Sequence, residues 1–125
     1  MRTVYPVLRY TDPRSAIEWL RAAFGFTAHA VHEAPDGTVA HAELVFGTGM
    51  IMLGPRPAAA SAPVRAADDD YVVYVAVDDL DAHHDRARAA GAEIVRPPFD
   101  TDYGSRDYAA RDLDGNVWSF GTYRI

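Results

Sequence analysis

Residues 5–26 read YPVLRYTDPRSAIEWLRAAFGF, and residues 72–93 read VVYVAVDDLDAHHDRARAAGAE. Each stretch begins with an apolar run that predicts a β-strand. It then passes through an aspartate, Asp12 or Asp79, into a segment with helical character. Aspartate is a preferred helix N-cap, and the glycine near the end of each stretch is typical of a helix C-terminus. The sequence therefore predicts a strand followed by a helix twice, in two halves about 67 residues apart.

Three more strands are expected after each predicted helix. They cover residues 26–33, 39–46 and 50–53 in the first half and residues 92–96, 105–111 and 117–123 in the second half. Pro97-Pro98 is expected to close the short strand 92–96. This order predicts an α+β fold of two βαβββ modules, residues 1–56 and 71–125, joined by a Pro/Ala-rich linker over residues 57–70. The two curved, mixed sheets are expected to surround a shared cleft for a small ligand.

The composition excludes several kinds of function. The chain has 125 residues, a formal net charge of −6, no cysteine and no lysine. Without cysteine it cannot form disulfides, a thiolate zinc site or a cysteine nucleophile. The negative charge argues against a nucleic-acid partner, which needs clustered positive charge. No apolar run approaches the roughly 20 residues of a membrane span. The N-terminal residues lack a signal-peptide pattern, so we expect a cytoplasmic protein with no membrane association.

Residues 103–120, YGSRDYAARDLDGNVWSF, form the most specific motif of the chain. They resemble the WGxRxFxxxDPxGNxxxF signature of the bleomycin-resistance-like branch of the vicinal oxygen chelate superfamily (glyoxalase / bleomycin resistance protein / dioxygenase). Residues 5–12 and 77–80 resemble the superfamily in the same register. The resemblance implies one glyoxalase-like domain of two βαβββ modules and a homodimer. It does not by itself imply catalysis, because the fold hosts several chemistries and one non-catalytic role.

The resemblance also locates metal ligands, because the metal enzymes of the superfamily place His or Glu at four equivalent strand positions. In this chain the four positions hold Tyr5, Met52, Val72 and Ser119. Valine has no donor atom, and methionine offers only a soft thioether. We therefore predict no metal at these positions and no other cofactor.

The histidines leave a displaced metal site open as an alternative. His41 and Glu43 lie two residues apart on a predicted strand, so they share one face of the sheet. His29 or His32 can reach that face from the adjacent strand. A metal held there, or metal-free acid–base chemistry, would make the protein an enzyme such as a lyase, an isomerase or a dioxygenase-like member of the superfamily.

Aromatic and apolar side chains dominate the predicted cavity. Tyr74 and Tyr103 carry the main prediction, because the resemblance places aromatic, drug-lining residues at the matching positions. The predicted ligand-binding set also contains Tyr5, Met50, Met52, Val72, Tyr108 and Ser119. Strand alternation predicts that Leu8, Tyr10, Ile51, Leu53, Val73, Val75, Val77, Trp118 and Phe120 pack under the helices, with Val117 facing the cavity. Asp100 and Asp102 are expected near the mouth of the pocket, where they can attract a cation.

Together these observations predict a non-catalytic small-molecule-binding protein of the antibiotic-resistance type. We expect a homodimer that sequesters an aromatic or cationic natural product in an aromatic groove. The sequence does not identify the ligand, and the enzyme with a site near His41 and Glu43 stays the alternative.

Overall fold

The computed structural model describes residues 3–57 and 72–125. The chain divides into two units, Met1–Pro63 and Val64–Ile125, and each unit is considered by itself. The predicted linker, residues 57–70, lies outside the described residues except for Pro57. Neither helix in the described ranges is long and apolar enough to cross a membrane.

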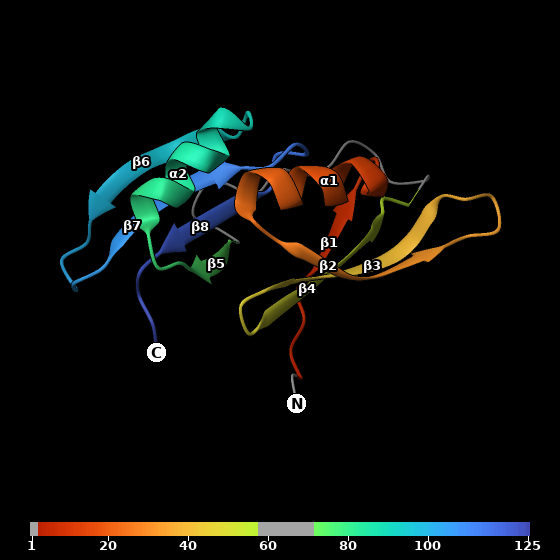
Figure 1. Ribbon diagram of the computed structural model, residues 1–125, viewed down its shortest axis with the longest axis horizontal. Helices are drawn as coiled ribbons and strands as arrows, with labels where there is room; N and C mark the ends of the chain where they lie inside the picture. Colours follow the sequence, from red (N-terminus) through yellow and green to blue (C-terminus); the bar gives the residue numbers. More distant parts are fainter. Residues whose placement is uncertain (1–2, 58–71) are drawn as a thin grey trace. The chain divides into compact units, whose positions relative to one another are not determined.

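The first unit is a four-stranded mixed sheet with one helix (Figure 1). Its elements are β1 (Val7–Tyr10), α1 (Pro13–Phe24), β2 (Thr27–Glu33), β3 (Val39–Phe46) and β4 (Gly49–Pro55). The strand order is β1-β4-β3-β2, with β1 parallel to β4 and the other neighbours antiparallel. This is the predicted order of strand, helix and three strands.

The second unit repeats this topology. Its elements are β5 (Val73–Ala76), α2 (Leu80–Ala89), β6 (Glu93–Asp100), β7 (Arg106–Arg111) and β8 (Val117–Gly121). The strand order is β5-β8-β7-β6, and β5 is parallel to β8. The predicted α+β fold of two βαβββ modules is therefore confirmed.

Aspartate caps begin both helices. Asp12 accepts a hydrogen bond from the backbone N–H of Ser15 at 3.3 Å, and Asp79 accepts one from that of Ala82 at 3.1 Å. At its other end, α1 stops at Gly25, whose φ of 86° lies in the left-handed region that favours glycine. These local signals fix where the chain leaves the helix and returns to the sheet.

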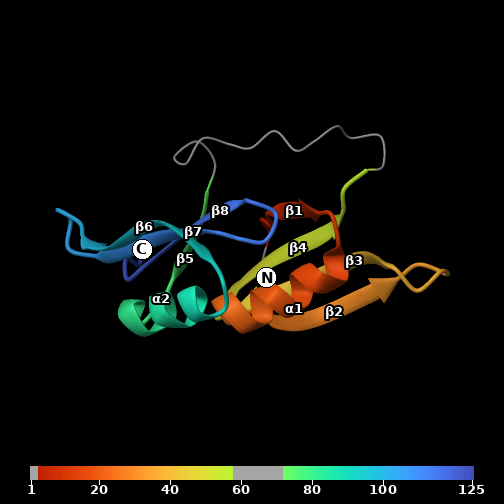
Figure 2. The same ribbon diagram turned by 90° about the horizontal axis from the view of Figure 1, so that it is seen from above.

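Each helix lies across one face of its own sheet, as Figures 1 and 2 show. We call the face of each sheet that is turned away from its helix the open face. The residues predicted to pack under the helices include the buried Tyr10, Ile51, Leu53, Val75, Val77, Trp118 and Phe120. Strand alternation thus predicts the two faces well. Val117 lies two residues before Ser119 and pairs with Arg111, so it shares the open face as predicted, although it is buried there.

The edge strands that follow the two helices, β2 and β6, each contain one extra residue. It stands at the corresponding position in the two units. The pairing of β2 with β3 shifts between Ala28 and Ala30, and the pairing of β6 with β7 shifts between Ile94 and Arg96. The intervening residues, His29 and Val95, stand 66 positions apart, which is the offset of the two helix-ending glycines. Such a bulge changes the alternation of side chains along the strand.

β6 is longer than the sequence predicts. The strand continues through Pro97-Pro98 to Asp100, with a second register shift between Arg96 and Phe99. The proline pair is tolerated there because β6 is an edge strand of the sheet, where proline removes no obligatory ladder hydrogen bond. The prediction that the two prolines close the strand is therefore wrong.

Candidate functional site

The open face of the second sheet gathers several of the predicted site residues. Tyr74 on β5 lies opposite Ser119 on β8, and Ser119 lies opposite Ala109 on β7. Residues that lie opposite each other in a sheet point to the same face. Val72 precedes Tyr74 by two residues and continues this surface beside β5.

Three tyrosines line a hollow of about 400 Å³ in the second unit. We call it the tyrosine pocket, and its residues are Tyr74, Tyr103 and Tyr123. The rings of Tyr103 and Tyr123 meet edge to face, with centroids 5.7 Å apart. Tyr103 is 62% exposed, so most of its ring is accessible to a ligand. The structure places Tyr74 and Tyr103 in one pocket, and their role in binding stays a prediction.

Two hydrogen bonds fix the hydroxyl of Tyr74. It donates to Oδ1 of Asp107 at 3.1 Å and accepts from the backbone N–H of Tyr123 at 3.2 Å. Burial raises the pKa of Tyr74, so the phenol stays protonated and keeps its donor. A side chain at Gly121 would collide with both the Asp107 carboxylate and the Tyr74 hydroxyl. The ring of Tyr74 is therefore held in one orientation.

Asp107 also anchors the loop that carries Tyr103. The Ser105 hydroxyl donates to Oδ1 of Asp107 at 3.0 Å. Across the loop, the Thr101 hydroxyl donates to the carbonyl of Ser105 at 3.1 Å and accepts from its N–H at 3.0 Å. Asp107 is buried. Through these hydrogen bonds its carboxylate positions Tyr74 directly and the loop that carries Tyr103 through Ser105.

A second hollow, of about 500 Å³, lies along the same sheet. We call it the arginine recess, and it is lined by Val72, Val95, Arg96, Phe99, Tyr108, Ala109 and Ser119. The guanidinium carbon of Arg96 lies 3.6 Å from the centre of the Phe99 ring, which is a cation–π contact. Neither of these two residues belongs to the set predicted from the sequence.

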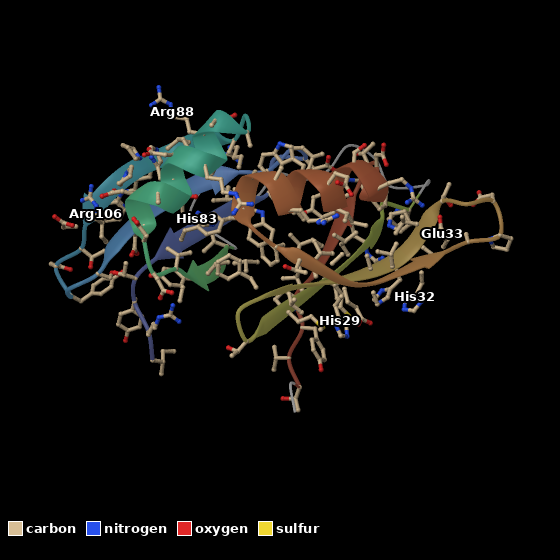
Figure 3. All side chains as sticks on the ribbon, in the orientation of Figure 1. His29, His32, Glu33, His83, Arg88 and Arg106 are labelled. Atoms are coloured by element: carbon tan, nitrogen blue, oxygen red, sulfur yellow. The ribbon has the colours of Figure 1, made fainter. Side chains whose placement is uncertain are left out.

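Tyr108 borders the arginine recess, but its ring lies on the helix side of the sheet. It is fully buried opposite Phe120, and its hydroxyl lies 2.6 Å from Nδ1 of His83 on α2. Figure 3 shows His83 on the side of α2 that faces the sheet. The alternation of β7 turns the ring into the core, and a role of Tyr108 in ligand binding stays a prediction.

The four positions that the resemblance assigns to metal ligands offer an unsuitable donor set. Tyr5 is exposed just before β1, and Met52 is half-buried on β4 with Met50 two residues before it. Val72 and Ser119 belong to the second unit. A phenol, a thioether, a hydroxyl and an alkyl group do not form a set that hard divalent cations prefer. Within residues 3–57 and 72–125, no three His, Cys, Asp or Glu side chains are grouped to hold a metal ion. A metal-free protein stays a prediction.

The histidines of the first sheet gather on its open face. His32 lies opposite His41, with ring centroids 5.7 Å apart, and Nε2 of His41 lies 3.3 Å from Oε2 of Glu43. Figure 3 shows His29 and His32 on the side of the sheet away from α1, which agrees with a bulge at His29. Of the predicted displaced site, the structure brings His41 into direct contact with Glu43 and stacks His32 beside them.

A comparison with models of protein families gives a match over nearly the whole chain. Residues 2–120 match the model of the Glyoxalase/Bleomycin resistance protein/Dioxygenase superfamily. The chain belongs to this superfamily. The superfamily inferred from the sequence motifs is thereby confirmed.

The matches to similar proteins span nearly the whole of this chain. The crystal structure of TioX from Micromonospora sp. ML1 is 36% identical with a TM-score of 0.79, and the match covers 99% of this chain and 98% of that chain. A mutant of glyoxalase I from Zea mays is 19% identical with a TM-score of 0.76 over 99% of this chain and 45% of that chain, which shows the fold alone. The uncharacterized protein Rv0887c of Mycobacterium tuberculosis is 30% identical over 121 residues, or 93% of this chain and 71% of that protein.

Sequence reasoning misses Arg96 and Phe99 in the arginine recess and Tyr123 in the tyrosine pocket. It also misses Asp107, which holds the Tyr74 hydroxyl beside that pocket. Strict alternation places Arg96 and Phe99 on opposite faces, because they are three residues apart. The signal that corrects this is Pro97-Pro98, since polyproline geometry repeats every three residues and aligns positions i and i+3. Asp107 carries no comparable signal, because a lone aspartate in a strand is recognised as buried only from the fold.

Proposed function

We propose that this member of the glyoxalase superfamily is a non-catalytic small-molecule-binding protein of the antibiotic-resistance type. It holds an aromatic natural product against Tyr74, Tyr103 and Tyr123. The observation that carries the proposal is the tyrosine pocket, a hollow lined by three aromatic rings within one unit. The donor set at Tyr5, Met52, Val72 and Ser119 supports binding rather than metal-dependent catalysis.

The pocket suits a planar ligand for two physical reasons. A phenol ring stacks on another aromatic surface with a gain of about 0.5–1.5 kcal/mol per pair beyond burial. Tyr74 is already held by Asp107 and by the Tyr123 N–H, so binding a ligand costs little further ordering of that side chain.

A fluorescence titration tests the proposal. Intercalating and glycopeptide drugs are titrated while tyrosine and tryptophan emission is followed, and we expect saturable quenching with at least one of them. Tyr103→Ala is expected to weaken that binding about tenfold, because it removes an exposed stacking ring. Leu113→Ala is the matched control, since Leu113 is an exposed apolar side chain outside both hollows. No saturable binding across the panel would contradict the proposal.

The contact between His41 and Glu43 supports a second candidate, an enzyme of the lyase, isomerase or dioxygenase-like kind with a displaced metal. An imidazole nitrogen 3.3 Å from a carboxylate oxygen can act as an acid–base pair or supply two metal ligands. The test is the metal content of the purified protein and of its His41→Ala and Glu43→Ala variants. Stoichiometric metal that disappears in both variants would favour the enzyme over the binding protein.

We also propose that the protein acts as a homodimer. The open faces carry apolar side chains that are more than a third exposed, among them Tyr5, Val7, Val72 and Tyr74. Exposed apolar side chains on the open face of a sheet are typical of a face that binds a partner.

A further inference from the structure

Arg96 presents its charge inside a hollow that is otherwise nearly apolar. The arginine recess is bordered by the side chains of Val72, Val95 and Phe99 and by the small residues Ala109 and Ser119. The guanidinium carbon of Arg96 lies 3.6 Å from the centre of the Phe99 ring. A cation–π contact does not use the five N–H donors of the guanidinium, which remain for an anion.

No carboxylate neutralises Arg96 within the described residues. Among these residues, Arg96 has no hydrogen bond and no ion pair, whereas Arg14, Arg106 and Arg111 each pair with a carboxylate. Glu93, on the same strand, pairs with Arg111 at 3.2 Å. The positive charge of Arg96 is therefore available to an external anion.

The backbone holds Arg96 and Phe99 in place. Pro97 and Pro98 fix their own φ angles, and a proline restricts the residue before it to extended conformations. The register shift between Arg96 and Phe99 brings both side chains to the same recess. The cationic wall is thus preformed, which lowers the entropy lost on binding.

Two carboxylates near the two hollows, those of Asp107 and Asp100, are already paired. Asp107 accepts hydrogen bonds from Tyr74 and Ser105, and Asp100 pairs with Arg106 at 3.1 Å. The carboxylate of Asp100, which the sequence predicts as an attractor of cations, is therefore partly neutralised. Arg96, in contrast, has no ion pair in the part of the chain that the structure describes, so its charge is open to an anionic ligand.

We propose that the ligand of this protein is an aromatic anion whose carboxylate or sulfonate group binds Arg96 in the arginine recess. The inference rests on the proposed binding function and specifies its aromatic ligand as an anion, whereas the sequence analysis expects an aromatic or a cationic ligand. Tyr74, in the tyrosine pocket, lies opposite Ser119, in the arginine recess, so the two hollows adjoin on one sheet face. A planar body stacks on the tyrosines while the anionic group reaches the guanidinium.

Two dyes with one aromatic skeleton test the inference. Anilinonaphthalene sulfonate carries an anionic group, and N-phenylnaphthylamine is its neutral counterpart. We expect the native protein to bind the sulfonate about tenfold more tightly in a fluorescence titration, because the charge-assisted hydrogen bonds to Arg96 add to the stacking. The net charge of −6 disfavours any general attraction of the sulfonate, so a preference points to a local cation.

Arg96→Met separates the charge from the apolar surface. The variant keeps a long apolar side chain, and we expect it to lose the preference for the sulfonate and to bind the neutral dye as the native protein does. The matched control is Arg88→Met, which removes an exposed arginine on the outer side of α2 (Figure 3) and is expected to keep the preference.

Four outcomes overturn the inference. Equal binding of the two dyes to the native protein does so, and so does a preference that survives Arg96→Met. Loss of both dyes in Arg96→Met overturns it as well, because the effect is then not specific to charge. The fourth outcome is that neither dye binds, and the drug panel then decides on the proposed binding function. If both dyes bind equally well, the inference falls but the proposed binding function stands.

Discussion

Gly121 lies where the second sheet leaves no room for a side chain. An added Cβ would approach Cγ of Asp107 to 2.6 Å and would also collide with the Tyr74 hydroxyl. We expect Gly121→Ala to lower the free energy of unfolding by about 1–3 kcal/mol, because overpacking displaces both partners. Urea denaturation measures this change, and the emission of the tyrosine pocket is expected to change with it.

Gly49→Ala is the control for this prediction. Its nearest neighbour is the carbonyl oxygen of Phe46 at 3.5 Å, an ordinary contact, and its φ is not positive. We expect a change within about 0.5 kcal/mol. Equal effects of the two alanines would show that the position of Asp107 and Tyr74 does not depend on the glycine.

Tyr108 makes stability depend on alkaline pH. Burial raises its pKa well above the usual value of 10.0. A raised pKa in the folded state means that the stabilisation is complete below pH 10 and is lost as the pH rises through the folded pKa. We expect the free energy of unfolding in urea to fall above pH 10 and to fall less steeply in Tyr108→Phe.

The same variant has a cost near neutral pH. Tyr108→Phe removes the hydroxyl that contacts Nδ1 of His83 at 2.6 Å, and we expect a loss of about 1 kcal/mol. Tyr103→Phe serves as the control, since this tyrosine is 62% exposed and the substitution removes no buried hydroxyl. An unchanged alkaline slope in Tyr108→Phe would contradict the assignment.

At the residue scale, strand alternation predicts side-chain faces and fails where alternation breaks. It correctly separates exposed Tyr74 and Val72 from buried Val75 and Phe120. It fails at Arg96, because the extra residues of β6 are visible only once strand pairing is known. Tyr108 is a different case, since it belongs to the predicted binding set while its own strand turns the ring into the core.

At the scale of the secondary-structure elements, we expect the aspartate cap of α1 to stabilise the fold. The Ser15 hydroxyl donates to Asp12 at 2.8 Å, and this bond, with a second one from the Ser15 N–H, lowers the pKa of that carboxyl. We expect Asp12→Ala to lower the midpoint temperature of unfolding at neutral pH, because the first turn of α1 loses its acceptor. Scanning calorimetry measures the change.

The pH dependence of this variant follows from the lowered pKa. The stabilisation by Asp12 is present above its ordinary pKa of 3.8 and is lost as the pH falls through the folded value. The difference between native protein and Asp12→Ala should therefore shrink in acid. Asp102→Ala, which removes an exposed carboxylate outside any helix, should lower the midpoint temperature less at neutral pH.

Helix limits are predictable from the sequence because their signals are local. Asp12, Asp79 and Gly25 act within one turn of where they stand. The length of β6 is not predictable in this way. Whether Pro97-Pro98 ends a strand depends on whether that strand is central or at an edge, and the edge position is set by pairing with β7.

At the scale of the whole molecule, we expect a homodimer in solution. A lone sheet would leave the exposed tyrosine and valine side chains of its open face in water. Light scattering should give twice the mass of one chain at micromolar concentration. Replacing Val72 and Val7 by Asp should shift the mass toward one chain, whereas the same change at Leu113 should not. A single-chain mass at every concentration would contradict the prediction.

The extra residues at His29 and Val95 occupy the same step of the corresponding strand in the two units. An extra residue breaks the alternation of side chains, so one more side chain can face away from the helix. In the first unit this side chain is an imidazole on the open face, and in the second it forms part of the wall of the arginine recess. The same backbone irregularity therefore adds side chains of different chemistry to the two open faces.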